Sequence, residues 1–329
     1  MSNVKVGVVG TGHLGNLHTK FFSQAKNCNL VGIFDKNIET AKQVAETHGT
    51  KVFNNLENLL TETDAVSIVA TTSAHYEIAK LAIENGNHVM IEKPITTTLE
   101  EAQELIDLAK SKDLKIQVGH IERFNPALVS LEKYNLDPMF VQTDRLAQFN
   151  PRGTDVAVVL DLMIHDIDII LSLIKSKVKN ISASGVAVVS DNLDIANARL
   201  EFENGAVANV TASRISLKKM RKMRMFQRDA YISLDFGTGV SEVFRLEEPG
   251  VELPDYAISY GEIGVSDKKK TIVFEKPENI ELNALQHEIQ LFVDCVKNGT
   301  EPIVTGQDGL RALRVAQIII QKINENNIS

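Results

Sequence analysis

VKVGVVGTGHLG, residues 4–15, joins an apolar strand pattern directly to a glycine-rich turn. The turn reads GxGxxG and is followed by a helical pattern, the context in which such glycines bind a dinucleotide. Gly10 permits the tight turn, Gly12 lets the backbone approach a pyrophosphate, and Gly15 lets the helix pack on the strand. The helix N-terminus adds unpaired N–H groups for the phosphates. We therefore predict a dinucleotide site made by Gly10, Thr11, Gly12, His13, Leu14 and Gly15.

A carboxylate completes this signal. Asp35 ends the next apolar run, LVGIFD (30–35). A carboxylate there can accept hydrogen bonds from both ribose hydroxyls of the adenosine and would repel a 2′-phosphate. The sequence therefore favours NAD over NADP as the cofactor, although Lys36 is a neighbouring cation that can offset part of the repulsion.

The first third of the chain continues with apolar strands separated by helical patterns. The strand patterns are AVSIVAT (65–71), HVMIEKP (88–94) and KIQVGH (115–120). Near-continuous Val and Ile in strands that alternate with helices indicate a parallel sheet covered on both faces. We predict an α/β protein with an N-terminal Rossmann domain, a doubly wound parallel sheet, over residues 1–119.

The pattern changes after Gly119. Strands with period-two alternation follow, among them ANARLEF (196–202) and AVANVTASRI (206–215), which the hairpin signal Asn204-Gly205 joins. One long helix is expected at 160–174, and a helix pair, about 283–297 and 309–324, closes the chain. We predict a C-terminal α+β domain, residues 120–329, with a large open, mostly antiparallel sheet and helices on one face.

The helix LDLMIHDIDIILSLI (160–174) combines apolar residues with three aspartates and a histidine. On an α-helical wheel, Asp161, His165 and Asp168 share one polar stripe. Asp161 is four residues from His165, where a carboxylate can orient an imidazole and favour its protonated form. Asp166 points roughly 100° away, so His165, Asp166 and Asp168 do not converge and we predict no metal. Asp168 either supports the site or makes a domain contact.

Composition excludes several classes of protein. The net charge is −8 and the pI about 5.6, which argues against broad nucleic-acid binding. No apolar stretch is long enough to span a bilayer, and the amino terminus shows no leader pattern. Cys28 and Cys295 have no CxxC spacing, so neither a disulfide framework nor a zinc site is indicated. We expect a cytoplasmic protein without nucleic-acid or membrane partners.

Several motifs in order resemble the glucose-fructose oxidoreductase, inositol dehydrogenase and MocA (Gfo/Idh/MocA) family over nearly the whole chain. They are GTGHLG with Asp35, the segment 70–94 that ends in Glu92-Lys93-Pro94, Asp161 with His165 as a DxxxH helix, and IVTGQDGLRALRVAQIII (303–320). The resemblance implies an NAD-dependent dehydrogenase that acts on a sugar hydroxyl.

Three segments resemble, within that family, the branch that oxidises UDP-N-acetylglucosamine or its uronic acid at the 3-hydroxyl. They are GHIERFNPA (119–127), RGTDVAVVLDLMIHDIDI (152–169) and SRISLKKMRKMRMF (213–226). Many sugar dehydrogenases carry a glycine-rich run where this chain has Ala157-Val158-Val159. This departure favours a nucleotide sugar as substrate over a free sugar or inositol. A non-catalytic NAD-sensing regulator would have little reason to keep Lys93, Asp161 and His165 together.

Alcohol oxidation requires a group that accepts the hydroxyl proton as the hydride leaves. His165 is the predicted general base, because histidine titrates near the required pH, and Asp161 orients it. Lys93 ends a sheet strand, where ligands bind, and would stabilise the developing alkoxide; it is also the other candidate for the base. Pro94 biases Lys93 toward extended backbone geometry. The expected substrate contacts are Lys93, Arg123, Asn125, Asp161 and His165.

The resemblance also places His75, Glu92 and Lys93 near the cofactor, and Thr71 and Thr72, which end the third strand, are expected to offer it hydroxyls or backbone groups. His75 has an alternative reading as a helix N-terminal residue without a ligand contact, and Arg123 has one as a structural salt bridge. The six basic residues between Arg214 and Arg224 are read as a solvated face, or else as a contact for a substrate diphosphate or a neighbouring subunit. The family resemblance implies a homodimer or homotetramer through the C-terminal sheet.

Overall fold

The computed structural model describes residues 2–150, 156–254 and 256–327, and it divides into two compact units. Unit 1 contains residues up to Ile121 together with Asn283–Arg314, and unit 2 contains Glu122–Leu282 and the residues from Val315 onward. These units differ from the expected domains 1–119 and 120–329, because residues 283–314 pack with the N-terminal part. As independently folding domains, 1–119 and 120–329 stay a prediction.

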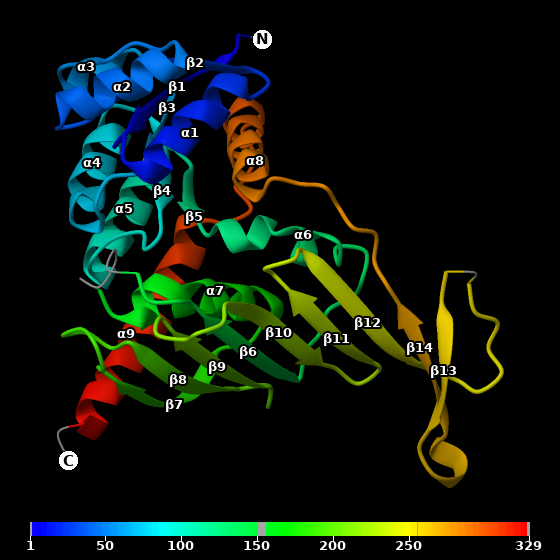
Figure 1. Cartoon of the computed structure of the whole chain (residues 1–329). Coiled ribbons are helices and arrows are strands. Elements are labelled where there is room, and N and C mark those ends of the chain that lie inside the picture. Colours follow the sequence, from blue (N-terminus) through cyan, green and yellow to red (C-terminus); the bar gives the residue numbers. More distant parts are fainter. Residues whose placement is uncertain (1, 151–155, 255, 328–329) are drawn as a thin grey trace. The chain divides into compact units, whose positions relative to one another are not determined.

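Unit 1 is built on the predicted parallel sheet. Its order is β2-β1-β3-β4-β5, and all neighbouring strands are parallel (Figure 1). The strands are β1 (Val4–Val9), β2 (Cys28–Phe34), β3 (Ala65–Ile68), β4 (His88–Glu92) and β5 (Ile116–Gly119). The strand order reverses at β1, so the switch point where open α/β sheets bind ligands lies between β1 and β3. The predicted Rossmann fold is confirmed.

Helices connect these strands and supply most of the remaining secondary structure of unit 1. They are α1 (His13–Gln24), α2 (Ile38–His48), α3 (Leu56–Thr61), α4 (Thr72–Glu84), α5 (Leu99–Ser111) and α8 (Ala284–Asn298). The short α3 was not predicted, since six residues carry too little periodicity. A capping box starts α5: the Thr98 side chain accepts from the Glu101 N–H, and the Glu101 carboxylate accepts from the Thr98 N–H.

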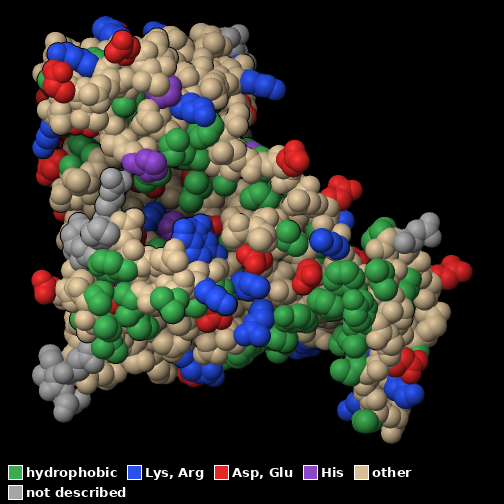
Figure 2. All heavy atoms as spheres, viewed as in Figure 1, with side chains coloured by type: hydrophobic (Ala, Val, Ile, Leu, Met, Phe, Trp, Pro, Cys, Tyr) green, Lys and Arg blue, Asp and Glu red, His purple; other side chains and the backbone are tan. Residues whose placement is uncertain are grey.

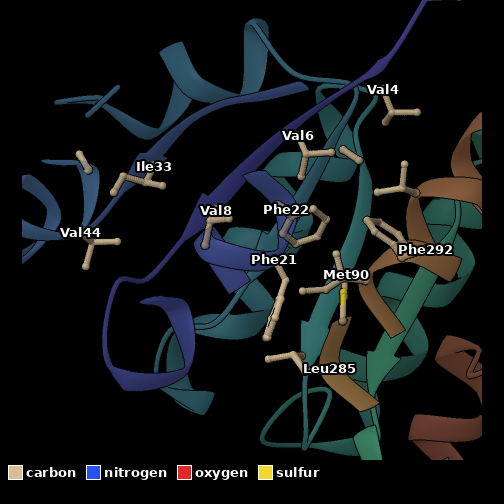
Figure 3. Packing of buried hydrophobic residues seen from close by; sticks show 14 residues of the cluster. Val4, Val6, Val8, Phe21, Phe22, Ile33, Val44, Met90, Leu285 and Phe292 are labelled. Atoms are coloured by element: carbon tan, nitrogen blue, oxygen red, sulfur yellow. The ribbon is translucent and has the colours of Figure 1, made fainter. Parts of the chain in front are cut away.

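Helix α8 joins unit 1 through an apolar cluster. In Figure 3, Phe21 and Phe22 of α1, Met90 of β4, and Leu285 and Phe292 of α8 point toward one another. Phe22, Met90 and Phe292 are at most 1% exposed, and burying each such side chain contributes about 1.5–3 kcal/mol. This burial explains why α8, which begins 173 residues after the end of α5, belongs to the N-terminal unit.

Unit 2 is built on a nine-stranded sheet of order β13-β14-β12-β11-β10-β6-β9-β8-β7. Only β6 and β9 pair in parallel among these neighbours, which confirms the prediction of a mostly antiparallel sheet. The strands are β6 (Phe140–Leu146), β7 (Val178–Val186), β8 (Ile195–Phe202), β9 (Val207–Ser213), β10 (Met220–Phe226), β11 (Ala230–Asp235), β12 (Val240–Glu247), β13 (Ile258–Ile263) and β14 (Lys270–Glu275). The predicted hairpin joins β8 and β9, and Gly205 has φ +85° there.

One face of this sheet is buried. Val141, Met225, Ile232, Val243 and Val273 lie on it and are at most 1% exposed. The helical elements of unit 2 are η1 (Ile121–Phe124), α6 (Pro126–Val129), η2 (Val159–Met163), α7 (Ile164–Leu173), η3 (Ser266–Lys268) and the end of α9 (Gly306–Asn327), which begins in unit 1. Helix α7 packs against β6 and β9. Within the described residues, no helix combines the length and apolarity needed to cross a bilayer.

Candidate functional site

The glycine turn after β1 has the geometry that the sequence predicts. Gly10 has φ +94°, and a Cβ there would lie 2.6 Å from the Val69 carbonyl oxygen. A Cβ on Gly15 would lie 2.0 Å from the Gly10 oxygen, so only glycine permits this packing. At Gly12, by contrast, no heavy atom of the described residues lies within 4 Å of the Cβ position. Open space at the N-cap of α1 fits the close approach of a pyrophosphate.

Asp35, which follows β2, forms hydrogen bonds to the glycine turn. Its Oδ2 accepts from the Thr11 N–H at 2.6 Å and from the Thr11 hydroxyl at 2.9 Å, while Oδ1 accepts from the Asn37 N–H at 2.7 Å. Thr11 is buried, whereas His13 and Leu14 are exposed in the first turn of α1. The carboxylate is therefore fixed beside the glycine turn, which suits the predicted ribose contact.

Lys93 directly follows β4, and the Lys93–Pro94 peptide bond is cis. The preceding residue, Glu92, is contacted by His18, which in turn contacts Ser67, and sequence reasoning missed both. His18 Nε2 lies 3.1 Å from Glu92 Oε1, and His18 Nδ1 lies 2.9 Å from the Ser67 hydroxyl. His18 follows Gly15 by one helical turn, and that position was the available signal.

The charge of Glu92 is stabilised by this arrangement. Burial raises the pKa of Glu92, but the hydrogen bond from His18 and the charges of His18 and Lys93 outweigh burial, so the pKa lies below its usual range. The Lys93 N–H also donates to this carboxylate. Glu92 therefore stands as an anion beside Lys93.

His75 and the threonines occupy the turn after β3. His75 is 1% exposed, and its Nδ1 and Nε2 lie 3.0 Å and 3.1 Å from the carbonyl oxygens of Pro94 and Ala70. Burial lowers the pKa of His75 although the carbonyls oppose it, so we assign a neutral ring that donates to one of them. His75 thus braces the turns after β3 and β4. Thr71 is the N-cap residue of α4, which Thr72 begins; cofactor contacts from all three stay predictions.

The helix with Asp161 and His165 corrects the expectation of one regular α-helix over 160–174. Val159–Met163 is a π-helical turn, in which Ile164 donates its N–H to the Val159 carbonyl five residues earlier. The α-helical wheel therefore does not apply between Asp161 and His165. Such turns accommodate an extra residue and are frequent at functional sites. Both side chains are half-buried.

Two arginines form ion pairs with the two carboxylates of α7, Asp166 and Asp168. Asp166 is 2% exposed and accepts from Arg145 Nε at 3.0 Å and Nη2 at 2.7 Å, and Arg145 Nη1 donates to Glu122 at 2.7 Å. Arg123 donates to Asp168 through Nε at 2.6 Å and Nη2 at 2.9 Å. A buried carboxylate is tolerated when it is paired in this way. The described residues contain no group of three His, Cys, Asp or Glu placed to hold a metal ion.

Arg123 forms a structural salt bridge with Asp168, which was the alternative to a substrate contact. Asn125 is likewise engaged, because its Nδ2 donates to Glu122 at 3.0 Å and to the Phe236 carbonyl at 3.1 Å. Its Oδ1 accepts from the Ala127 N–H at the start of α6. Substrate contacts from Arg123 and Asn125 stay predictions, and the structure adds a bracing role for both.

The six basic residues from Arg214 to Arg224 do not form one patch, because their side chains lie in different environments. Arg214 is buried and donates to the Val156 carbonyl. On β10, Arg221 lies on the same face as the buried Met223 and reaches within 3.7 Å of Glu122. Lys222, on the opposite face, lies 3.5 Å from Asp235. Strand alternation accounts for this division.

Two models of known protein families match the chain. Residues 4–120 match the oxidoreductase family with an NAD-binding Rossmann fold, and residues 134–232 match the GFO/IDH/MocA C-terminal domain. Arg152–Asp155, the start of the motif RGTDVAVVLDLMIHDIDI, lie outside the described residues.

Similar proteins include several sugar dehydrogenases. The chain is 36% identical over 320 residues to a UDP-N-acetylglucosamine 3-dehydrogenase of Acidithiobacillus ferrooxidans, with 96% of each chain covered. It is 28% identical to a scyllo-inositol 2-dehydrogenase (NAD(+)) of Bacillus subtilis, covering 95% of this chain and 92% of the relative. A solved structure of the Acidithiobacillus enzyme, GnnA, superposes with a TM-score of 0.87 at 34% identity and covers 98% of each chain.

Proposed function

The chain belongs to the GFO/IDH/MocA family and is an NAD-dependent dehydrogenase, and from this premise we propose that it oxidises C3 of a UDP-N-acetylhexosamine. The observation that carries the proposal is the similarity to the UDP-N-acetylglucosamine 3-dehydrogenase, which extends over 96% of both chains. The inositol dehydrogenase shares less identity. The two free cysteines, Cys28 and Cys295, suit the reducing cytoplasm that we propose as its location.

The proposed mechanism assigns one task to each residue. NAD, when bound, supplies the hydride acceptor. His165 takes the hydroxyl proton, and Asp161 favours the protonated imidazole that results. Lys93 donates a hydrogen bond to the reacting oxygen and stabilises its developing negative charge. Asp166 and Asp168 are paired with arginines, and the task is assigned to Asp161 as the acidic residue of the DxxxH motif.

A substrate panel tests the proposed function. NADH formation is followed by absorbance with UDP-N-acetylglucosamine, its uronic acid, free N-acetylglucosamine and inositols, in the presence of an amine-transferring enzyme that removes ketone product. We expect turnover with a UDP-linked sugar and submillimolar binding of that sugar only. Equal or greater turnover with a free polyol would contradict the proposed substrate, and no turnover with any alcohol would contradict the proposed catalysis.

Replacing Asp35 with alanine is expected to weaken NAD binding by about 10- to 100-fold, the effect of losing hydrogen bonds to a charged group. NADP should lose much less affinity, because the charge that repels its 2′-phosphate is also removed. Fluorescence titration of each cofactor measures both dissociation constants. Asp64→Ala is a matched control at another strand end, where the carboxylate accepts from the Lys5 N–H. Unchanged NAD affinity in Asp35→Ala would refute the ribose contact.

We propose that the open face of the unit 2 sheet binds a second copy of this chain. A row of directly opposed residues crosses this face, with ring centroids 4.8–5.9 Å apart between neighbouring strands. The aromatic row consists of Phe140, Phe226, Tyr231, Phe244 and Phe274. In Figure 2, hydrophobic side chains gather where Figure 1 draws β11 to β14. Phe226 is exposed and the other four are half-buried, and a contiguous apolar surface open to solvent marks an interaction site.

Charge favours a second copy as the occupant. Arg224 and Glu242 both flank the aromatic row on this face, each opposite Ser233 of β11. In a two-fold contact, Arg224 of each protomer can meet Glu242 of the other, which makes the surface self-complementary. The row and the flanking charges thus support a homodimer, and a homotetramer if a second surface also pairs.

Phe226→Glu is expected to halve the mass in solution, because Phe226 lies within the row with rings on both sides and is 41% exposed, and a buried unpaired carboxylate is costly at an interface. Light scattering after size exclusion measures the mass. Leu217→Glu, a change at a 92% exposed residue outside the row, should leave it unchanged. A wild-type monomer, or a Phe226→Glu protein of unaltered mass, would contradict this interface.

A further inference from the structure

His18 is a buried histidine whose two ring nitrogens both have side-chain partners. It is 0% exposed, and it links Ser67 of β3 to Glu92 at the end of β4 through contacts of 2.9 Å and 3.1 Å. The short distance to an anionic carboxylate places an N–H on Nε2, while Nδ1 lies against the Ser67 hydroxyl. His18 of α1 thereby links β3 to the end of β4, the strand that precedes Lys93.

The partner of His18 acts directly on Lys93. The Glu92 carboxylate accepts the Lys93 N–H and is electrostatically coupled to the Lys93 side chain. Because the carboxylate is fixed by His18, the backbone of Lys93 is fixed with it. We propose that His18, itself oriented by Ser67, is a positioning residue that acts through Glu92 to aim the Lys93 ammonium group; this inference rests on the proposed function of Lys93.

Two further observations favour this role over simple packing. Gly119 of β5 leaves the room that the carboxylate occupies, since a Cβ there would lie 2.8 Å from Glu92 Oε1. A buried ion pair also adds little to stability compared with apolar side chains of the same volume. A chain that needed only a filled core would have no use for His18, Ser67 and Glu92 at this position.

The first experiment compares turnover among variants of this chain of contacts. His18→Leu removes the N–H to Glu92 and is expected to lower kcat by about 10- to 100-fold, the range for losing a partner that orients a functional group. His18→Gln keeps an amide donor and should recover part of this loss, and Ser67→Ala should have a smaller effect. NAD affinity should stay within about threefold. His48→Gln is the matched control, because His48 is a half-buried histidine of unit 1 whose Nε2 lies 2.8 Å from the Asn16 side-chain oxygen.

A double-mutant cycle separates positioning from general damage. If His18 acts through Glu92, His18→Leu combined with Glu92→Gln should lower kcat no further than Glu92→Gln does. Full additivity of the two losses, or an unchanged kcat in His18→Leu, would overturn the inference. The melting temperature of His18→Gln, which retains hydrogen-bonding capacity, shows whether a loss of activity comes from unfolding.

A labelling measurement tests the same inference without turnover. Removing or disorienting the anion beside Lys93 favours the neutral, nucleophilic amine, so acetylation of Lys93 by limiting acetic anhydride should become about threefold faster relative to Lys42. His18→Leu and Glu92→Gln should both show this change, and His48→Gln should not. If the wild type oxidises no sugar, the proposed function fails while labelling still decides the inference. Unchanged Lys93 labelling in both variants would contradict it whatever the activity.

Discussion

Lys93→Met is expected to lower kcat by about 10²- to 10⁴-fold, while the affinity for NAD changes little. Methionine keeps the unbranched stem of the side chain but removes the donor that would stabilise the developing alkoxide. The effect should appear in kcat and in kcat/KM together, because the interaction is strongest in the transition state. Steady-state NADH formation and a fluorescence titration of NAD measure the two quantities.

Lys42→Met is the matched control for this change. Lys42 is exposed on α2 and pairs with Glu39 three residues earlier on the same helix, so its removal should leave kcat unaltered. A Lys93→Met enzyme with wild-type turnover would show that Lys93 has no part in the chemistry. Equal losses in NAD affinity and in kcat/KM would instead assign Lys93 to cofactor binding.

Arg145→Met is expected to lower the free energy of unfolding by about 3–5 kcal/mol, the cost of leaving buried carboxylates without their partner. Arg145 is 3% exposed and holds both Asp166 and Glu122. Urea denaturation monitored by circular dichroism measures the change. Arg199→Met is the control, because Arg199 forms an exposed pair with Glu201 and such a pair contributes at most about 1 kcal/mol.

The loss in Arg145→Met should depend on pH in a defined direction. Burial already raises the pKa of Asp166, and the Arg145 charge opposes that rise. Without Arg145 the folded-state pKa of Asp166 rises further, so its protonated form is the stable buried form. A raised folded-state pKa gives stability that is present at low pH and lost as the pH rises through that pKa. The deficit should therefore be smaller at pH 5 than at pH 8; an equal or larger deficit at pH 5 would contradict a buried charge as its cause.

Much of the fold could be predicted because its determinants are local. The glycines at 10, 12 and 15 sit beside a strand of Val residues, and the structure shows that Gly10 and Gly15 leave no room for a side chain. The Asn204-Gly205 turn was also readable from two adjacent residues. The attachment of α8 to unit 1 was not, because it depends on Phe292 meeting side chains far away in the sequence.

Less of the candidate site could be predicted, because its contacts join residues that are far apart in the sequence. Arg145 is 21 residues from Asp166, and no periodicity connects a strand residue to a helix residue at that separation. The π-turn before His165 was not readable because the apolar pattern fits an α-helix equally well. His18 was missed since a histidine in a helix more often packs than functions, and only the contacts with Ser67 and Glu92 distinguish it.

Isotope transfer tests the central claim most directly. UDP-N-acetylglucosamine carrying deuterium at C3 is incubated with the protein and NAD, and the reduced cofactor is analysed by mass spectrometry. Oxidation at C3 predicts NADH that is one mass unit heavier, together with ordinary NADH when the deuterium is placed at C4 instead. Unlabelled NADH from the C3-labelled sugar, or deuterium transfer from C4, would contradict the account.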